Sequence, residues 1–163
     1  MAVLEIKTYP ENILKQKADQ IEVITPQIEK LTENMIKTMR AASGVGLAGP
    51  QVGQGKRIFI ADPDSELKKP LVFINPEIIK REGRIISEEG CLSLPGIGAK
   101  VPRAERVILR AQNIKGKQIE IRADGLLACI IQHEFDHLDG VLFIDRLGFF
   151  KKRLVMRKYK NVD

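Results

Sequence analysis

The segment Gly125-Leu-Leu-Ala-Cys-Ile-Ile-Gln-His-Glu-Phe-Asp-His-Leu138 predicts a buried helix at the centre of this protein. Asp124 is a favourable N-cap residue, and the first two turns are apolar on nearly every side. His133 and His137 lie one turn apart on one helix face, with Glu134 beside them, which is the H-E-x-x-H pattern of a shared metal ion. Burying these groups without a partner would cost several kcal/mol. The pattern therefore indicates a bound cation.

A catalytic metal site normally has three protein ligands, so the third ligand separates the possible families. One metalloprotease class continues the pattern to a third histidine, but this chain has Gly140 at the glycine position and Phe143 where that histidine would stand. A class that uses a downstream glutamate is also excluded, because Glu134 is the last glutamate in the sequence. Asp139 and Asp145 remain as carboxylate candidates just beyond the helix.

The two cysteines offer a thiolate as the alternative third ligand. Cys129 lies on the same helix, eight residues before His137, and eight residues rise about 12 Å along a helix. Both side chains cannot reach one ion over that distance, so Cys129 is interpreted as a core residue. Cys91 follows Gly90 in a separate segment. One thiolate and the imidazoles of His133 and His137 would leave an open fourth position for water.

The rest of the chain predicts an α+β fold in which short, mostly antiparallel strands pack around a central metal-binding helix. An amphipathic helix is expected over residues 25–39 in the N-terminal half, and a basic helix over about residues 148–163. Loops are expected at residues 43–53 and 88–96, which are rich in glycine. Short apolar runs predict strands at residues 57–61, 71–75, 107–111 and 119–123.

Composition limits the protein to a few classes. With 163 residues, 44% apolar and 29% charged, the chain is expected to form a single catalytic domain over residues 1–163. The longest apolar run covers residues 126–131, whereas a membrane-spanning helix needs about 20, so no membrane partner is expected. The charged residues Glu5 and Lys7 interrupt the continuous apolar segment that a secretory signal needs, which favours a cytoplasmic protein.

The net charge of +6 is concentrated at the end of the chain, in residues 151–153 and 157–160. Such a terminal segment is most simply a solvated helix, and it can also bind nucleic acid or an acidic partner.

Three motifs resemble the signatures of the peptide deformylase family, in order and at suitable separations. They are Gly44-Val-Gly-Leu-Ala-Gly-Pro-Gln51, Glu89-Gly-Cys-Leu-Ser93 and Gln132-His-Glu-Phe-Asp-His-Leu138. Weaker similarity extends over effectively the whole chain. The sequence departs from the commonest family pattern at Gly49, where an alanine is usual. Because Gly49 lies two residues before Gln51, this departure bears on how precisely the Gln51 side chain is positioned.

The resemblance implies a metal-dependent hydrolase that removes the N-formyl group from the N-terminal methionine of nascent bacterial polypeptides and releases formate. Cys91, His133 and His137 would hold the metal, and metal-bound water would attack the formyl carbon with Glu134 as general base and then general acid. The side-chain amide of Gln51 and the backbone N–H of Leu92 would hold the oxyanion.

The resemblance also implies how substrate binds. The backbone of Gly46 would pair with the peptide as an added strand, and Val45, Leu126, Cys129 and Ile130 are candidates to line the methionine pocket. Each of these residues could equally be plain core.

By the same resemblance the expected cofactor is one Fe(II) ion per chain, with zinc, nickel or cobalt as possible substitutes. One thiolate and two imidazoles suit zinc at least as well as iron, so the ligand types do not select the metal. The expected partners are N-formyl-methionyl nascent peptides and, through the basic C-terminal segment, ribosomal RNA, with no DNA.

Two other functions compete with deformylation. One is a metallopeptidase of the wider H-E-x-x-H group, for which the usual third ligand is missing. The other is a non-catalytic, metal-stabilised module that binds ribosomes or RNA, which would have no use for Glu134 or Gln51.

Overall fold

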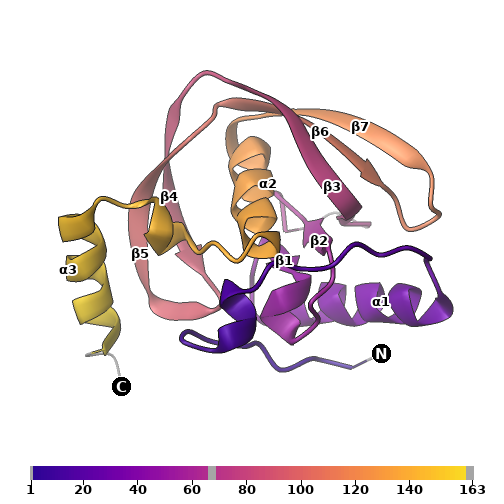
Figure 1. Ribbon diagram of the computed structural model, residues 1–163, viewed down its shortest axis with the longest axis horizontal. Coiled ribbons are helices and arrows are strands. Elements are labelled where there is room, and N and C mark those ends of the chain that lie inside the picture. Colours follow the sequence, from indigo (N-terminus) through magenta and orange to yellow (C-terminus); the bar gives the residue numbers. More distant parts are fainter. Residues whose placement is uncertain (1, 66–68, 161–163) are drawn as a thin grey trace.

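The computed structural model describes residues 2–65 and 69–160, and its elements follow the α+β pattern expected from the sequence (Figure 1). In chain order they are η1 (Asn12–Lys15), α1 (Pro26–Ala41), β1 (Gly46–Ala48), η2 (Gly49–Val52), β2 (Ile58–Ala61), β3 (Leu71–Glu82), β4 (Ile85–Cys91), β5 (Leu94–Arg103), β6 (Arg106–Gln112), β7 (Gln118–Asp124), α2 (Gly125–Leu138), η3 (Phe143–Arg146) and α3 (Phe149–Lys160), where η denotes a 3₁₀ helix.

The strands form two antiparallel sheets. The larger sheet has the order β1-β2-β3-β6-β7, and β4 and β5 make a separate two-stranded sheet. The long strand β3 pairs with β2 over its first residues and with β6 over most of its length. Figure 1 shows the β4–β5 hairpin on one side of α2 and strands β3, β6 and β7 on the other. The expected central position of the metal-motif helix is therefore confirmed.

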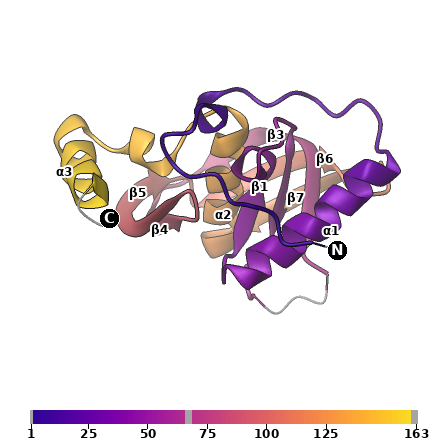
Figure 2. The ribbon, with the colours of Figure 1, turned by 90° about the horizontal axis from the view of Figure 1, so that it is seen from below.

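The alternation of side chains between the two faces of β2 explains how the larger sheet packs a helix against each of its faces. Phe59 and Ala61 share a buried cluster with Ala128 and Ile131 of α2. The intervening residues Ile58 and Ile60 point to the other face, because side chains alternate along a strand. There they join apolar residues of α1, which Figure 2 shows running along that side of the sheet. The α1 residues in this cluster are Ile28, Met35 and Met39.

The expected helix over residues 25–39 is confirmed as α1, with Thr25 as N-cap and Pro26 in its first turn. The strands expected from apolar runs are present as β2, β3, β6 and β7. In the turn between β6 and β7, the side chain of Asn113 accepts hydrogen bonds from the backbone N–H groups of Lys115 and Lys117.

Two loop predictions were wrong in part. The glycine-rich segment 43–53 contains β1 and η2, and the segment 88–96 contains the end of β4 and the start of β5. Every residue of β4 is partly or fully exposed, so its sequence lacks the apolar alternation that reveals a strand packed on a core. Cys91 consequently lies at the end of a strand rather than in the middle of a loop.

The basic C-terminal helix is present as α3, and its expected last residues, 161–163, lie outside the described part of the chain. Val155 is its one buried residue, and the hydroxyl of Tyr159 donates a hydrogen bond to the carbonyl of Tyr9 at 2.9 Å. Among the described residues, the structure has no helix both long and apolar enough to cross a membrane.

Candidate metal centre and adjoining cavity

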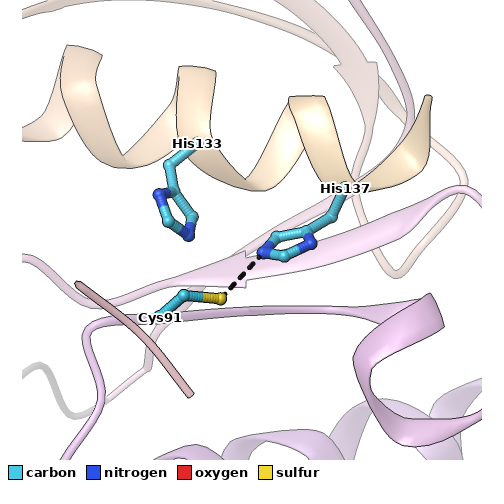
Figure 3. Close-up of side chains that lie close together, drawn as sticks. All are labelled: Cys91, His133 and His137. Atoms are coloured by element: carbon cyan, nitrogen blue, oxygen red, sulfur yellow. Dashed lines mark hydrogen bonds between the residues drawn. The ribbon is translucent and has the colours of Figure 1, made fainter. Parts of the chain in front are cut away.

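Two histidines of α2 and one cysteine of β4 bring their ligand atoms together. His133 and His137 project from the same side of α2 toward Cys91 (Figure 3). One ligand atom from each residue lies within 4.8 Å of the others, and the Cys91 Sγ lies 3.4 Å from the His137 Nε2. A register shift between Gly90 and Cys91 separates the cysteine from the regular pairing of β4 with β5.

The chemistry of this cluster fits a divalent transition-metal ion. Thiolate and imidazole are typical ligands of such ions. Two buried polar atoms at the site, the His137 Nδ1 and the Glu134 Oε2, have no hydrogen-bond partner among residues 2–65 and 69–160. Burial lowers the pKa of His137, with His133 adding to the effect, so its imidazole is in the neutral form that a metal requires.

Glu89 orients the second imidazole. Its Oε1 lies 2.8 Å from the His133 Nδ1, so this nitrogen donates the hydrogen bond and Nε2 is left to act as ligand. Burial alone would lower the pKa of His133, but hydrogen bonds to Cys91 and Glu89 raise it, so a proton and a metal ion compete for this imidazole.

A buried ion-pair network holds Glu89 in place. Arg103 donates to both carboxylate oxygens of Glu89, at 2.7 and 2.8 Å, and to Asp136 of α2 at 2.7 Å. Although burial raises the pKa of Glu89, the bonds from Arg103 and His133 outweigh it and lower that pKa to about 2. Arg146 then donates two further hydrogen bonds to Asp136. His133 is thus held, through Glu89, by a continuous chain of charged groups.

A cavity of about 140 Å³ opens beside the cluster. Its wall contains almost all of the residues singled out in the sequence. They are Val45, Gly46, Gln51, Cys91, Leu92, Leu126, Cys129, Ile130, His133 and Glu134. Cys129 and Ile130 are nearly buried, whereas Val45 and Leu126 are 38% and 61% exposed, so the latter two lie at the rim. Burial also raises the pKa of the Cys129 thiol.

Gln51 is fixed in place before any ligand binds. Its Oε1 accepts a hydrogen bond from the backbone N–H of Ala48 at 2.9 Å. Its Nε2 lies 3.2 Å from the Ser93 Oγ and 3.5 Å from the Cys91 Sγ. The side chain is therefore anchored through its oxygen, and its N–H donors point to the same region as the cysteine.

Glu134 occupies a space that exists because residue 46 is glycine. A Cβ atom added to Gly46 would lie 2.6 Å from the Glu134 Oε1, closer than real contacts allow. Burial raises the pKa of Glu134 to about 7. A carboxyl group with such a pKa can both accept and release a proton at neutral pH.

Gly49 is also a position of close approach. A Cβ atom there would lie 2.6 Å from the backbone oxygen of Lys56 and 2.9 Å from that of Gln54. Glycine at this position therefore permits tight packing of η2, which carries Gln51, against the turn that leads into β2.

The supporting residues Glu89, Arg103, Asp136 and Arg146 received no role from the sequence. Glu89 and Asp136 stand inside the second and third of the three motifs, but their pairing through Arg103 depends on the fold. The open candidates Asp139 and Asp145 are engaged elsewhere, Asp139 with Arg57 at 3.0 Å and Asp145 with Lys152 at 2.7 Å.

An α+β fold in which a central helix and a strand end bring one cysteine and two histidines together, beside a cavity lined by a glutamate, is characteristic of a metal-dependent hydrolase. Comparison with known proteins gives the particular family. The family model described as polypeptide deformylase matches residues 3–153. The chain belongs to this family.

Individual members of the family are similar to this chain over most of their length. A peptide deformylase of Thermodesulfovibrio yellowstonii is 51% identical in an alignment 163 positions long that covers 99% of each chain. The crystal structure of a peptide deformylase from Legionella pneumophila is 39% identical, with a TM-score of 0.94 over 98% of this chain and 94% of the other. A peptide deformylase from Synechococcus elongatus in complex with actinonin is 37% identical, with a TM-score of 0.93 over 96% and 88%.

Proposed function

We propose that this protein, as a single catalytic domain, removes the N-formyl group from the N-terminal methionine of nascent polypeptides and releases formate. The observation that carries the proposal is the cluster of Cys91, His133 and His137 beside a small cavity whose wall also contains Glu134. Membership of the polypeptide deformylase family supports this reaction over peptide-bond hydrolysis or a non-catalytic role.

In this proposal Cys91 and the two histidines hold one divalent metal ion per chain. Nε2 of His133 is the ligand atom because Glu89 engages Nδ1. The bound ion supplies Lewis acidity that activates a water molecule for attack on the formyl carbon. Fe(II) is the proposed ion, with zinc, nickel and cobalt as substitutes.

Glu134 acts as the proton carrier. Its buried carboxylate accepts a proton from the attacking water and then delivers it to the amine that leaves. The missing hydrogen-bond partner of Oε2 supports this role, because that oxygen is available to the reacting groups. Gly46 supports it as well by leaving room for the carboxylate.

Gln51 and Leu92 stabilise the negative charge that develops on the formyl oxygen. The side-chain amide of Gln51 is already anchored by Ala48, so little reorganisation is needed when charge appears. Leu92 contributes its backbone N–H from the turn that joins β4 and β5. Two such donors aimed at one oxygen are the usual arrangement for an oxyanion.

The substrate lies along the cavity. The backbone of Gly46 pairs with the peptide main chain as an added strand, which recognises the peptide without reading most of its sequence. The methionine side chain enters the apolar wall made by Val45, Leu126, Cys129 and Ile130. The exposed apolar side chains of Val45 and Leu126 favour this assignment, since they have surface left to bury.

The test is formate release from an N-formyl-methionyl peptide by protein purified and loaded with metal in the absence of oxygen. Glu134→Gln should abolish release while the metal content stays unchanged. Glu77→Gln, an exposed residue of β3, is the matched control and should retain full activity. No release by the metal-loaded wild type would contradict the function, and full activity of Glu134→Gln would contradict the role of Glu134.

The iron assignment has its own measurement. Exposure of the Fe(II) form to peroxide should remove activity as the metal or the Cys91 thiolate oxidises, whereas the zinc form should change little. Iron-loaded protein that keeps its activity and its iron in air would contradict Fe(II) as the oxygen-sensitive native ion.

We further propose that the enzyme works in the cytoplasm on chains leaving the ribosome, and that α3 contacts ribosomal RNA. Arg153 and Arg157 are exposed on this helix and can neutralise phosphates. Arg153→Glu combined with Arg157→Glu should abolish salt-dependent co-sedimentation with ribosomes and leave peptide deformylation unchanged. Unchanged co-sedimentation would remove α3 from this role.

A further inference from the structure

A second cavity, of about 560 Å³, lies where α2, the β3–β4 connection, the end of β5 and η3 meet. Gln132 and Asp136 face it from α2, one turn apart and on a different face from the residues that line the metal-site cavity. Its remaining wall is dominated by arginine. The arginines are Arg81, Arg84, Arg103 and Arg146.

The charges around this cavity do not balance. Asp136 is the acidic residue of its wall, and Arg103 and Arg146 already share that carboxylate, through hydrogen bonds of 2.7 to 3.1 Å. Arg103 also neutralises Glu89 on its other side. Within the part of the chain that the structure describes, the guanidinium groups of Arg81 and Arg84 have no carboxylate partner.

Two further acidic residues, Glu82 and Glu105, adjoin the wall in sequence and are engaged with other cations. Glu82, next to Arg81, pairs with Lys80 at 2.8 Å and with Arg106 at 3.6 Å. Glu105 pairs with Arg106 at 3.2 Å. The excess of positive charge in the cavity is therefore not cancelled by its surroundings.

Donor groups remain available to a ligand in this cavity. Arg146 uses Nε and Nη2 for Asp136, so its Nη1 stays without a protein acceptor among the described residues. Arg81 and Arg84 are exposed and present all of their N–H groups. Guanidinium groups are planar forks that match the oxygens of a phosphate group, and several of them around one cavity favour a doubly charged anion.

We propose that this arginine-lined cavity binds a phosphate group, either inorganic phosphate or the phosphate of a small monoester. Arg81, Arg84 and Arg146 donate to the phosphate oxygens, and Arg103 supplies positive charge from the buried side. The volume suits a small-molecule ligand of nucleotide size as well as the free ion. The site is separate from the proposed formyl-peptide cavity and shares only α2 and the Arg103 network with it.

The test is calorimetric titration of the metal-loaded protein at low ionic strength and neutral pH, with inorganic phosphate and with adenosine monophosphate as probes. Arg81→Ala combined with Arg84→Ala removes two unpaired cations but leaves the Arg103–Asp136–Arg146 contacts that support α2. Lys115→Ala combined with Lys117→Ala, in the exposed β6–β7 turn, removes the same charge elsewhere and is the control. Thermal midpoints without phosphate should be equal for all three proteins.

Saturable phosphate binding should weaken at least about tenfold in the arginine variant and stay within about twofold of wild type in the lysine variant. Phosphate can also bind near the metal, so binding by itself does not locate the site. The difference in affinity between the arginine variant and the lysine variant does. Binding of adenosine monophosphate with the same arginine dependence would identify the source as a monoester, and binding of inorganic phosphate alone would identify the free ion. Equal affinities for both variants, or no saturable binding of either probe to wild type, would overturn the proposal.

Discussion

The Glu89 Oε1 lies 2.8 Å from the His133 Nδ1, while both carboxylate oxygens of Glu89 accept hydrogen bonds from Arg103. One buried carboxylate thus sets the tautomer of a candidate metal ligand and neutralises a buried cation. Glu89→Gln should weaken metal binding by about 10- to 100-fold, because the amide holds the imidazole less strongly. It should also destabilise the fold by about 3 kcal/mol, since Arg103 loses a charged partner in a buried position.

Metal affinity in this variant is measured by competition with a chromophoric chelator, and stability by urea unfolding. Glu88→Gln is the matched control, because the neighbouring Glu88 is exposed and reaches Lys100 only at 4.0 Å. Metal affinity and stability should both stay near wild type there. Equal behaviour of the two variants would show that Glu89 does not orient His133.

Gly46→Ala should separate catalysis from metal binding. The new methyl group would come within 3.0 Å of three atoms of the Glu134 side chain, which must then move. A displacement of about 1 Å at a reacting group can reduce the rate about 100-fold. We therefore expect a kcat roughly two orders of magnitude lower at unchanged metal content, measured by formate release and metal analysis.

The control for that variant is Gly55→Ala. A Cβ atom at Gly55 meets no atom within 4 Å, so this second glycine-to-alanine change should leave kcat unchanged. A Gly46→Ala enzyme with wild-type kcat would mean that Glu134 works from another position than the one in the structure.

The sequence predicted the parts of this molecule that depend on local pattern. The helix α2 could be recognised because its apolar turns and its His133 and His137 spacing lie within one continuous segment. Cys91 was the remaining thiolate candidate because Cys129 is too far along the same helix, with Asp139 and Asp145 as carboxylate alternatives, and the structure brings Cys91 to both histidines.

Other parts depend on contacts between distant segments. The strand β4 is partly or fully exposed along its length and therefore shows no apolar alternation. The link from Glu89 through Arg103 to Asp136 joins residues of β4, β5 and α2, and nothing in their spacing indicates that they meet. The tight fit of Gly46 against Glu134 likewise appears only after β1 has been placed beside α2.

Gly49→Ala should restore the residue that is usual in the family and still reduce stability in this chain. The added methyl group would meet the backbone oxygens of Lys56 and Gln54, which cannot rotate away as a side chain could. Overpacking of this kind costs about 1 to 3 kcal/mol. Urea unfolding measures the loss, and kcat should fall as well, because η2 carries Gln51.

Gly55→Ala again serves as the control, since that position has open space. An unchanged midpoint and slope of unfolding for Gly49→Ala would mean that the turn at residues 54–56 yields without cost, and that the departure from the family pattern has no structural consequence here.

Removal of a metal ion from the cluster of Cys91, His133 and His137 should destabilise the folded protein. An ion that binds the folded state alone adds about 4 kcal/mol at a free concentration 1,000 times its dissociation constant. Treatment with a chelator should therefore lower the thermal midpoint by several degrees, and stoichiometric Fe(II) or zinc should restore it.

Cys91→Ser provides the decisive comparison, because it keeps the size of the side chain but replaces the soft thiolate ligand by a hydroxyl. In that variant the chelator-dependent shift should be much smaller than in wild type. A shift of equal size in both proteins would place the stabilising metal somewhere other than at Cys91, His133 and His137.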